Sequence, residues 1–101
     1  MVEQGAILKV QGIGCLVLVV SKSITNKDDF PIVCPIEKEN PNSTLYRQIA
    51  TDKTKGYVLC DSLKQLDLRA RSYSLVERLS LKEMIYVLDQ VQSLFDWTFS
   101  Y

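Results

Sequence analysis

The chain has no histidine among its 101 residues, and this absence removes several common kinds of catalysis. Serine and cysteine hydrolases activate their nucleophiles with a histidine base, so neither mechanism is available in its usual form. The sequence also lacks a Walker phosphate loop, a dinucleotide-binding fingerprint and the HExxH metalloprotease motif. Any acid–base chemistry must therefore come from a carboxylate or a similar group.

The chain also lacks an excess of charge, because its 12 basic and 12 acidic residues cancel. This balance argues against a protein that coats nucleic acid through bulk charge, but it allows a local basic groove. A net charge near zero also fits a protein that hides much of its surface in an oligomer or complex.

Long hydrophobic runs are missing too. Residues 1–5 lack the basic and apolar parts of a signal peptide, and the apolar run at residues 16–20 is too short to span a membrane. We therefore expect a cytoplasmic protein that does not enter a membrane.

The three cysteines form no CxxC pair and have no histidine to join them, so we expect no zinc site and no other cofactor. Cys15, Cys34 and Cys60 each stand in an apolar run of β character. We predict that they are buried, reduced thiols that behave as small hydrophobic residues.

Most of the chain has the composition of short strands separated by polar turns. The run at residues 15–21 is almost continuously apolar, which predicts a central strand buried on both faces. The strand at residues 31–36 should have a proline at each end, and the strand at residues 44–50 should lie at an edge. The other predicted strands are Ala6–Val10, residues 57–60 and Tyr73–Arg78.

One clear helix follows the last strand. Ser80 and Glu83 form a capping-box pattern, and an apolar stripe continues at helical spacing through the next 15 residues or so. We predict that this stripe packs on a sheet; the alternative is a helix that binds a partner. The predicted core positions are Leu81, Met84, Ile85, Leu88, Val91, Leu94 and Phe95.

These elements predict one domain over residues 1–101, mainly β with a C-terminal α-helix, built as a small SH3-like barrel or a curved antiparallel sheet. The aromatic tail at residues 97–101 should dock on the sheet or on a partner.

Residues 56–71 are the best candidate for a chemical site. Asp61 follows an apolar strand, Lys64 comes three residues later, and Arg69 and Arg71 follow shortly after. A carboxylate can take the proton from an RNA 2′-hydroxyl, while a cation stabilises the phosphorane. The alternative is that these are ordinary solvated charges at a strand end.

The same segment resembles the MazF/PemK/Kid family of toxins from toxin–antitoxin pairs, with the PemK/Kid branch nearest. The order Gly-Tyr-Val-Leu-Cys-Asp-Ser-Leu-Lys-Gln-Leu-Asp from Gly56 to Asp67 is similar to the branch's Arg-Cys-Asp-Gln-Pro-Arg-Thr-Ile-Asp segment. The strand at residues 31–36, the later Ala70-Arg71 and the final amphipathic helix follow in the family's order.

The resemblance implies a homodimer with a CcdB/MazF/Kid-like fold that cuts single-stranded RNA and is inhibited by a cognate antitoxin. It implies that Asp61 is the general base and that Lys64 is a basic residue beside the RNA. Glu37 and Lys38 stand at the positions where the family has Thr-Ser near the phosphate, so we assign both residues to RNA binding.

The chain departs from the family pattern at three places. Leu59 replaces an arginine that the branch uses in catalysis, Glu37 and Lys38 replace Thr-Ser, and the loop between the first two strands is shortened to residues 11–16. Loss of one such donor typically costs about 10²–10³ in rate. If the chemistry has been rebuilt, the available cations are Lys22, Lys38, Lys64, Arg69 and Arg71. We expect Lys64 or Lys38 to stabilise the phosphate, and we assign Lys22, Arg69 and Arg71 to RNA binding.

Two alternatives follow from these departures. The first is a catalytically inactive family member that binds antitoxin or RNA without cutting. The second is a CcdB-like gyrase poison, which the tryptophan after the final helix weakly suggests.

Overall fold

The computed structural model describes residues 2–95, apart from the side chains of residues 24 and 25. The aromatic tail, whose docking the sequence predicts, lies outside the described residues. The elements are β1 (Ala6–Val10), β2 (Leu16–Val19), η1 (Ser23–Asn26), β3 (Ile32–Glu37), β4 (Tyr46–Ala50), β5 (Lys55–Leu59), β6 (Lys64–Gln65), β7 (Tyr73–Arg78) and α1 (Leu81–Ser93).

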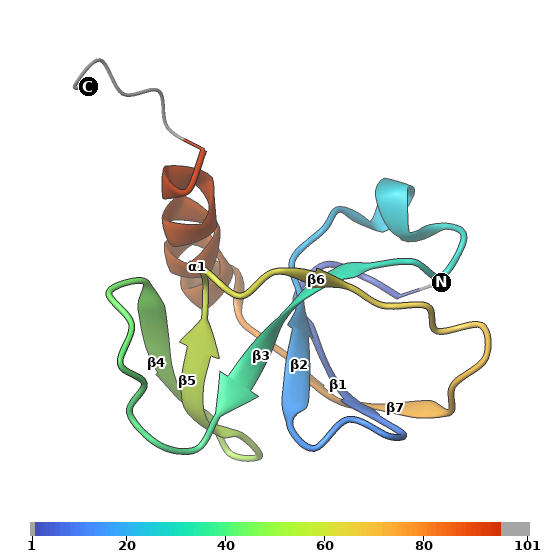
Figure 1. Cartoon of the computed structure of the whole chain (residues 1–101), viewed down its shortest axis with the longest axis horizontal. Helices are drawn as coiled ribbons and strands as arrows, with labels where there is room; N and C mark the ends of the chain where they lie inside the picture. The colour runs from blue at the N-terminus through green and yellow to red at the C-terminus, as the bar shows by residue number, and fades with distance from the viewer. Residues whose placement is uncertain (1, 96–101) are drawn as a thin grey trace.

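The strands form one curved antiparallel sheet in the order β4-β5-β3-β2-β1-β7, and the short β6 pairs with the start of β3. Figure 1 shows α1 standing beside β4 and β5, at one side of the sheet. The predicted fold class is confirmed in its curved-sheet form. The sheet is not a barrel closed by backbone hydrogen bonds, because β4 and β7 are its two edges. Within residues 2–95 no helix has the length and apolarity needed to cross a membrane.

The central strands are buried on both faces, because alternate side chains enter two different cores. Ile7 and Leu18 belong to the core that Met84 and Val87 of α1 complete. Their neighbours, such as Val17, belong to a second core on the opposite face. This confirms the predicted two-sided burial of β2, although the strand is shorter than expected.

The position of Pro35 differs from the prediction. It lies inside β3, opposite Val17, and not at the strand's end. On the other edge of β3 the partner changes from β6, which pairs through Val33, to β5, which pairs from Ile36. A proline is tolerated in this interval because that edge has no ladder bond to lose there.

Helix α1 begins as the capping pattern predicts, since the Ser80 hydroxyl accepts a hydrogen bond from the Glu83 amide at 3.2 Å. The Glu83 carboxylate, however, does not complete the capping box. It accepts two hydrogen bonds from Arg47 of β4, at 2.9 and 3.0 Å, and the Arg47 guanidinium also lies over the ring of Tyr86. Both groups of this pair are charged and the contact has two parallel hydrogen bonds, so it is a strong interaction that joins the helix to the edge strand.

Much of the predicted apolar stripe on α1 is not core. Met84 is buried and Leu88 and Val91 are partly buried, whereas the other predicted positions are exposed. A helix that packs on a sheet buries only the side chains that face the sheet. The apolar stripe of α1 extends around more of the helix than this contact covers. The exposed stripe residues are Leu81, Ile85, Leu94 and Phe95.

Candidate functional site

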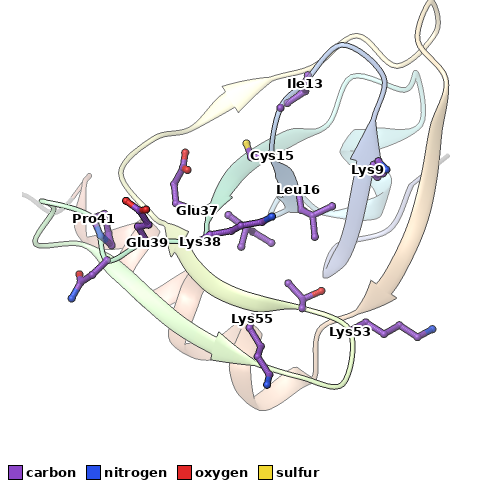
Figure 2. A pocket seen from close by; sticks show the side chains of 14 residues that line it. Lys9, Ile13, Cys15, Leu16, Glu37, Lys38, Glu39, Pro41, Lys53 and Lys55 are labelled. Atoms are coloured by element: carbon purple, nitrogen blue, oxygen red, sulfur yellow. The ribbon is translucent and has the colours of Figure 1, made fainter.

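A hollow of about 880 Å³ lies at the end of the sheet where three loops meet, and we call it the lysine pocket (Figure 2). The β1–β2 turn contributes residues 13–15, and the end of β3 with its following loop contributes residues 36–41. The β4–β5 turn contributes residues 53–55, and Lys9 comes from β1. Segments from four parts of the chain therefore form one concave surface.

The lysine pocket has an excess of positive charge. Its lining includes four lysines and two glutamates, and all six are exposed. Figure 2 shows Lys53 and Lys55 at the β4–β5 turn and Lys38 on the β3 side. Cations spread around a concavity attract an extended anion such as a nucleic-acid backbone. The charged residues are Lys9, Lys38, Lys53, Lys55, Glu37 and Glu39.

Two glycines adjoin the residues that line the lysine pocket. Gly12 in the β1–β2 turn has a φ of +85°, which L side chains rarely adopt. A Cβ on Gly56 of β5 would lie 2.5 Å from the carbonyl oxygen of Glu37. Gly56 therefore permits β5 to approach the end of β3 closely, beside the residues that line the hollow.

Asp61 lies beyond the opposite end of β5 from the lysine pocket. β5 is five residues long, so its ends are about 13 Å apart. The exposed Asp61 carboxylate accepts hydrogen bonds from the hydroxyls of Ser43, at 2.7 Å, and Ser62, at 3.4 Å. Ser43 also accepts a hydrogen bond from the Leu45 amide, so its hydroxyl proton is directed at Asp61.

The β3–β4 loop connects Asp61 with the pocket. Pro41 lines the pocket, and Ser43, which holds Asp61, is two residues farther along. Two residues of extended chain span at most about 7 Å. The base predicted from the sequence does not line the pocket, but the Ser43 hydrogen bond connects it to the loop that does.

The other predicted site residues are distributed over the surface. Glu37 and Lys38 line the lysine pocket, as a shared site requires. Lys64 is exposed on β6, paired with Val33 at the start of β3, whereas Glu37 ends that strand. Lys22 precedes η1 and lines neither the pocket nor the Asp61 site.

The two arginines make contacts of their own. Arg69 forms two hydrogen bonds to the Asp67 carboxylate, both at 3.1 Å, and stacks over the ring of Phe30. The guanidinium lowers the pKa of Asp67 through these hydrogen bonds. Arg71 donates a hydrogen bond to the Gln11 carbonyl at 3.3 Å and so contacts the β1–β2 turn. Their role in RNA binding stays a prediction.

Lys9, Lys53, Lys55 and Ser43 were not predicted as site residues from the sequence. Lys9 could have been noticed, because it is the single charge in the apolar strand Ala6–Val10. Lys53 and Lys55 stand in a polar turn that resembles many others, and no local pattern marks them. Ser43 acquires its importance only through its contact with Asp61.

The cysteines fall into two classes. Cys34 and Cys60 are fully buried, and burial raises their pKa values to about 12 and about 11. Cys15 is half-buried and lines the lysine pocket, so the prediction of a core thiol is wrong for this residue. Among the described residues, no three cysteine or carboxylate groups gather in a way that could hold a metal ion.

Comparison with known protein families agrees with this architecture. The model of a family described as "PemK-like, MazF-like toxin of type II toxin-antitoxin system" matches residues 6–95. The chain belongs to this toxin family. The match covers all the described strands and the helix, so the predicted family is confirmed, while the predicted PemK/Kid branch is not distinguished.

Solved structures show the same fold at low sequence identity. A MazE–MazF complex from Deinococcus radiodurans has a chain 20% identical, with a TM-score of 0.83 over 93% of this chain and 95% of that one. An endoribonuclease in complex with its cognate antitoxin, from a mycobacterial species, is 13% identical, with a TM-score of 0.82 over 97% and 100% of the two chains. MazF alone from Deinococcus radiodurans is 17% identical, with a TM-score of 0.81 over 93% and 96%. No curated protein is significantly similar in sequence.

Proposed function

We propose that this toxin-family protein acts on single-stranded RNA, which it binds in the lysine pocket. The observation that carries the proposal is the convergence of four lysines from separate segments around one hollow. A flexible single strand can follow such a surface, whereas the net charge of zero gives no bulk attraction for nucleic acid.

We assign the general base to Asp61 and the phosphate-stabilising cation to Lys38. Asp61 accepts only hydroxyl donors from the described residues, so its carboxylate is available to a substrate hydroxyl. Lys38 lines the pocket and belongs to the loop that contains Ser43, which donates a hydrogen bond to Asp61. The base would remove the 2′-hydroxyl proton, and the 2′-oxygen would attack the adjacent phosphorus. The bond to the 5′-oxygen would break, leaving a 2′,3′-cyclic phosphate on one product and, after the leaving oxygen takes a proton from water, a 5′-hydroxyl on the other.

The test is incubation of the purified protein with a long unstructured RNA, followed by analysis of the product ends. Asp61→Asn should lower the cleavage rate by about 10²–10⁴, the usual contribution of a general base. Asp89→Asn, on the exposed face of α1, is the matched control and should cleave normally. Equal cleavage by wild type and Asp61→Asn would remove Asp61 from the mechanism.

A second candidate function is RNA binding without cleavage. It is favoured by Leu59, which ends β5 two residues before Asp61 and has no polar group to stabilise a phosphorane. In this case the protein would form a stable RNA complex without yielding products. The alternative of a CcdB-like gyrase poison receives no support from the family model that matches.

We also propose an antitoxin partner, because two of the similar structures are complexes with antitoxins. An acidic segment of the partner would cover the lysine pocket and exclude RNA by charge competition. A short acidic reading frame next to the gene, whose product displaces RNA from the protein, would support this assignment. RNA and antitoxin bound together without competition would contradict it.

Finally, we propose a homodimer. Leu81 is 77% exposed and Ile85 is 51% exposed, one helical turn apart on the same face of α1. A pair of large apolar side chains on one face is typical of a contact surface. Light scattering should give the mass of a dimer, and Ile85→Asp should give a monomer. Lys82→Asp, an exposed change on the same helix, is the control.

A further inference from the structure

The β4–β5 turn, which carries Lys53 and Lys55, is organised around the hydroxyl of Thr51. This oxygen accepts hydrogen bonds from the amides of Thr54, at 2.9 Å, and Lys53, at 3.3 Å. Its proton is directed to the Glu77 carboxylate at 2.5 Å, a shorter contact than the 3.1 Å to the Thr54 carbonyl. A hydroxyl has one proton, and a charged acceptor at the shorter distance takes it.

Glu77 belongs to the opposite edge of the sheet. The turn follows β4, which is one edge strand, and Glu77 lies on β7, which is the other. β4 and β7 share no backbone ladder, so the Thr51–Glu77 hydrogen bond joins the two edges through side chains. The register of β7 shifts between its pairing with Ile7 and with Leu8, and such a bulge increases the local bend of a strand.

The same residue is connected to the other wall of the pocket. Glu77 pairs with Ile7 of β1, and Lys9 lies two residues farther along that strand, on the same face. A continuous set of contacts therefore runs from Lys9 through the β1–β7 ladder to Glu77, then through Thr51 to the turn with Lys53 and Lys55. This set connects the two walls of the hollow that carry Lys9 and the turn lysines.

We propose that Glu77 is a positioning residue, which holds the β4–β5 turn so that its lysines and Lys9 can bind one RNA backbone together. The inference rests on the proposed RNA binding in the lysine pocket. Glu77 is itself an anion, so as a mere electrostatic neighbour it would weaken RNA binding, and its neutralisation would strengthen it. If Glu77 instead positions the turn, its loss should weaken RNA binding.

Two neutral variants separate these roles. Glu77→Gln keeps an oxygen that can accept the Thr51 proton, whereas Glu77→Leu has a similar size and no acceptor. The affinity for a single-stranded RNA oligonucleotide is measured by fluorescence anisotropy at several salt concentrations, after thermal unfolding has shown that both variants fold. Glu77→Leu should bind about threefold to tenfold more weakly than Glu77→Gln, the net worth of one hydrogen bond.

The slope of binding against salt should also fall for Glu77→Leu, by about 0.7 for each phosphate contact that is lost. Equal affinities for the two variants, or tighter binding by both than by wild type, would overturn the inference. Glu83→Gln is the control, since it loosens the contact between β4 and α1 and does not touch the turn.

A second measurement does not depend on RNA. Hydrogen exchange of the Thr54 amide, which bonds to the Thr51 hydroxyl, should be several-fold faster in Glu77→Leu than in Glu77→Gln. Failure of wild type to bind RNA would contradict the proposed function, while the exchange rates would still decide the positioning role. Unchanged exchange in both variants would show that Glu77 does not hold the turn.

Discussion

The lysine pocket brings together residues that are distant in sequence, whereas the segment at residues 59–71 separates residues that are neighbours in sequence. The pocket collects Lys9, Lys38 and Lys53 from distant parts of the chain. The segment contains residues that are neighbours in sequence, yet Asp61 bonds to Ser43 while Arg69 bonds to Asp67. Turns at one end of a sheet gather side chains, whereas an extended chain advances about 3.3 Å per residue and separates them.

Thiol chemistry should show the largest difference between these two regions. Cys15 lines the pocket, while Cys60, which immediately precedes Asp61, is fully buried with a pKa raised by burial to about 11. In the native protein an alkylating reagent should modify Cys15 at least about 100-fold faster than Cys60. Mass spectrometry of peptides gives the ratio. In denaturant both thiols are exposed and should react at similar rates. Similar rates in the native protein would contradict the burial of Cys60.

Two glycine-to-alanine variants test how closely the strands pack at the pocket end of the sheet. A Cβ on Gly56 would lie 2.5 Å from a backbone oxygen, so Gly56→Ala should lower the free energy of unfolding by about 1–3 kcal/mol. Gly14, also in the pocket, has no atom within 4 Å of such a Cβ, and Gly14→Ala is the matched control. Urea unfolding measures both. A stable Gly56→Ala variant would mean that β5 and β3 are farther apart.

Charge removal compares the two regions as RNA-binding surfaces. Lys53→Ala together with Lys55→Ala should lower the slope of log affinity against log salt by about 1.4, since each phosphate contact contributes about 0.7. Lys64→Ala, on β6, should change the slope by less than one contact. A larger loss from Lys64→Ala than from the double variant would place the main RNA contacts around β6 and not in the lysine pocket.

The smallest effect is expected for the Arg47–Glu83 contact, which holds the edge strand β4 against α1. Hydrogen bonds from Arg47 lower the pKa of Glu83 below its ordinary value of 4.5. A lowered pKa adds stability above the ordinary value, and this stability is lost as the pH falls through the lowered pKa. Glu83→Gln should therefore cost about 1 kcal/mol or less at pH 7 and still less at pH 3, by thermal unfolding. An equal cost at both pH values would exclude this ion pair as the cause.

Much of the fold could be predicted from the sequence, because strands and helices follow local periodicity. Strands β1 and β7 have the predicted bounds, and Ser80 begins the helix as its capping pattern indicates. The short elements η1 and β6 were not predicted, and the larger errors concern partners. Glu83 binds Arg47 instead of completing the cap, and Ile85 is exposed instead of core. Periodicity reports which face of a helix is apolar, but not how much of that face a neighbour covers.

The candidate site was only half predictable for the same reason. Asp61 could be named because the chain has no histidine and the family resemblance puts the general base at this position. Ser43, which orients Asp61, and the lysines at the β4–β5 turn carry no local signal.

The sequence by itself therefore determined the family, the strands and the chemical groups that are available, since these depend on residue type and spacing along the chain. Only the tertiary structure decided that the cations meet in the lysine pocket and that Thr51 reaches Glu77 across the two edges of the sheet. The physical reason is the curvature of the sheet, which brings together edges that are separated by the whole strand order.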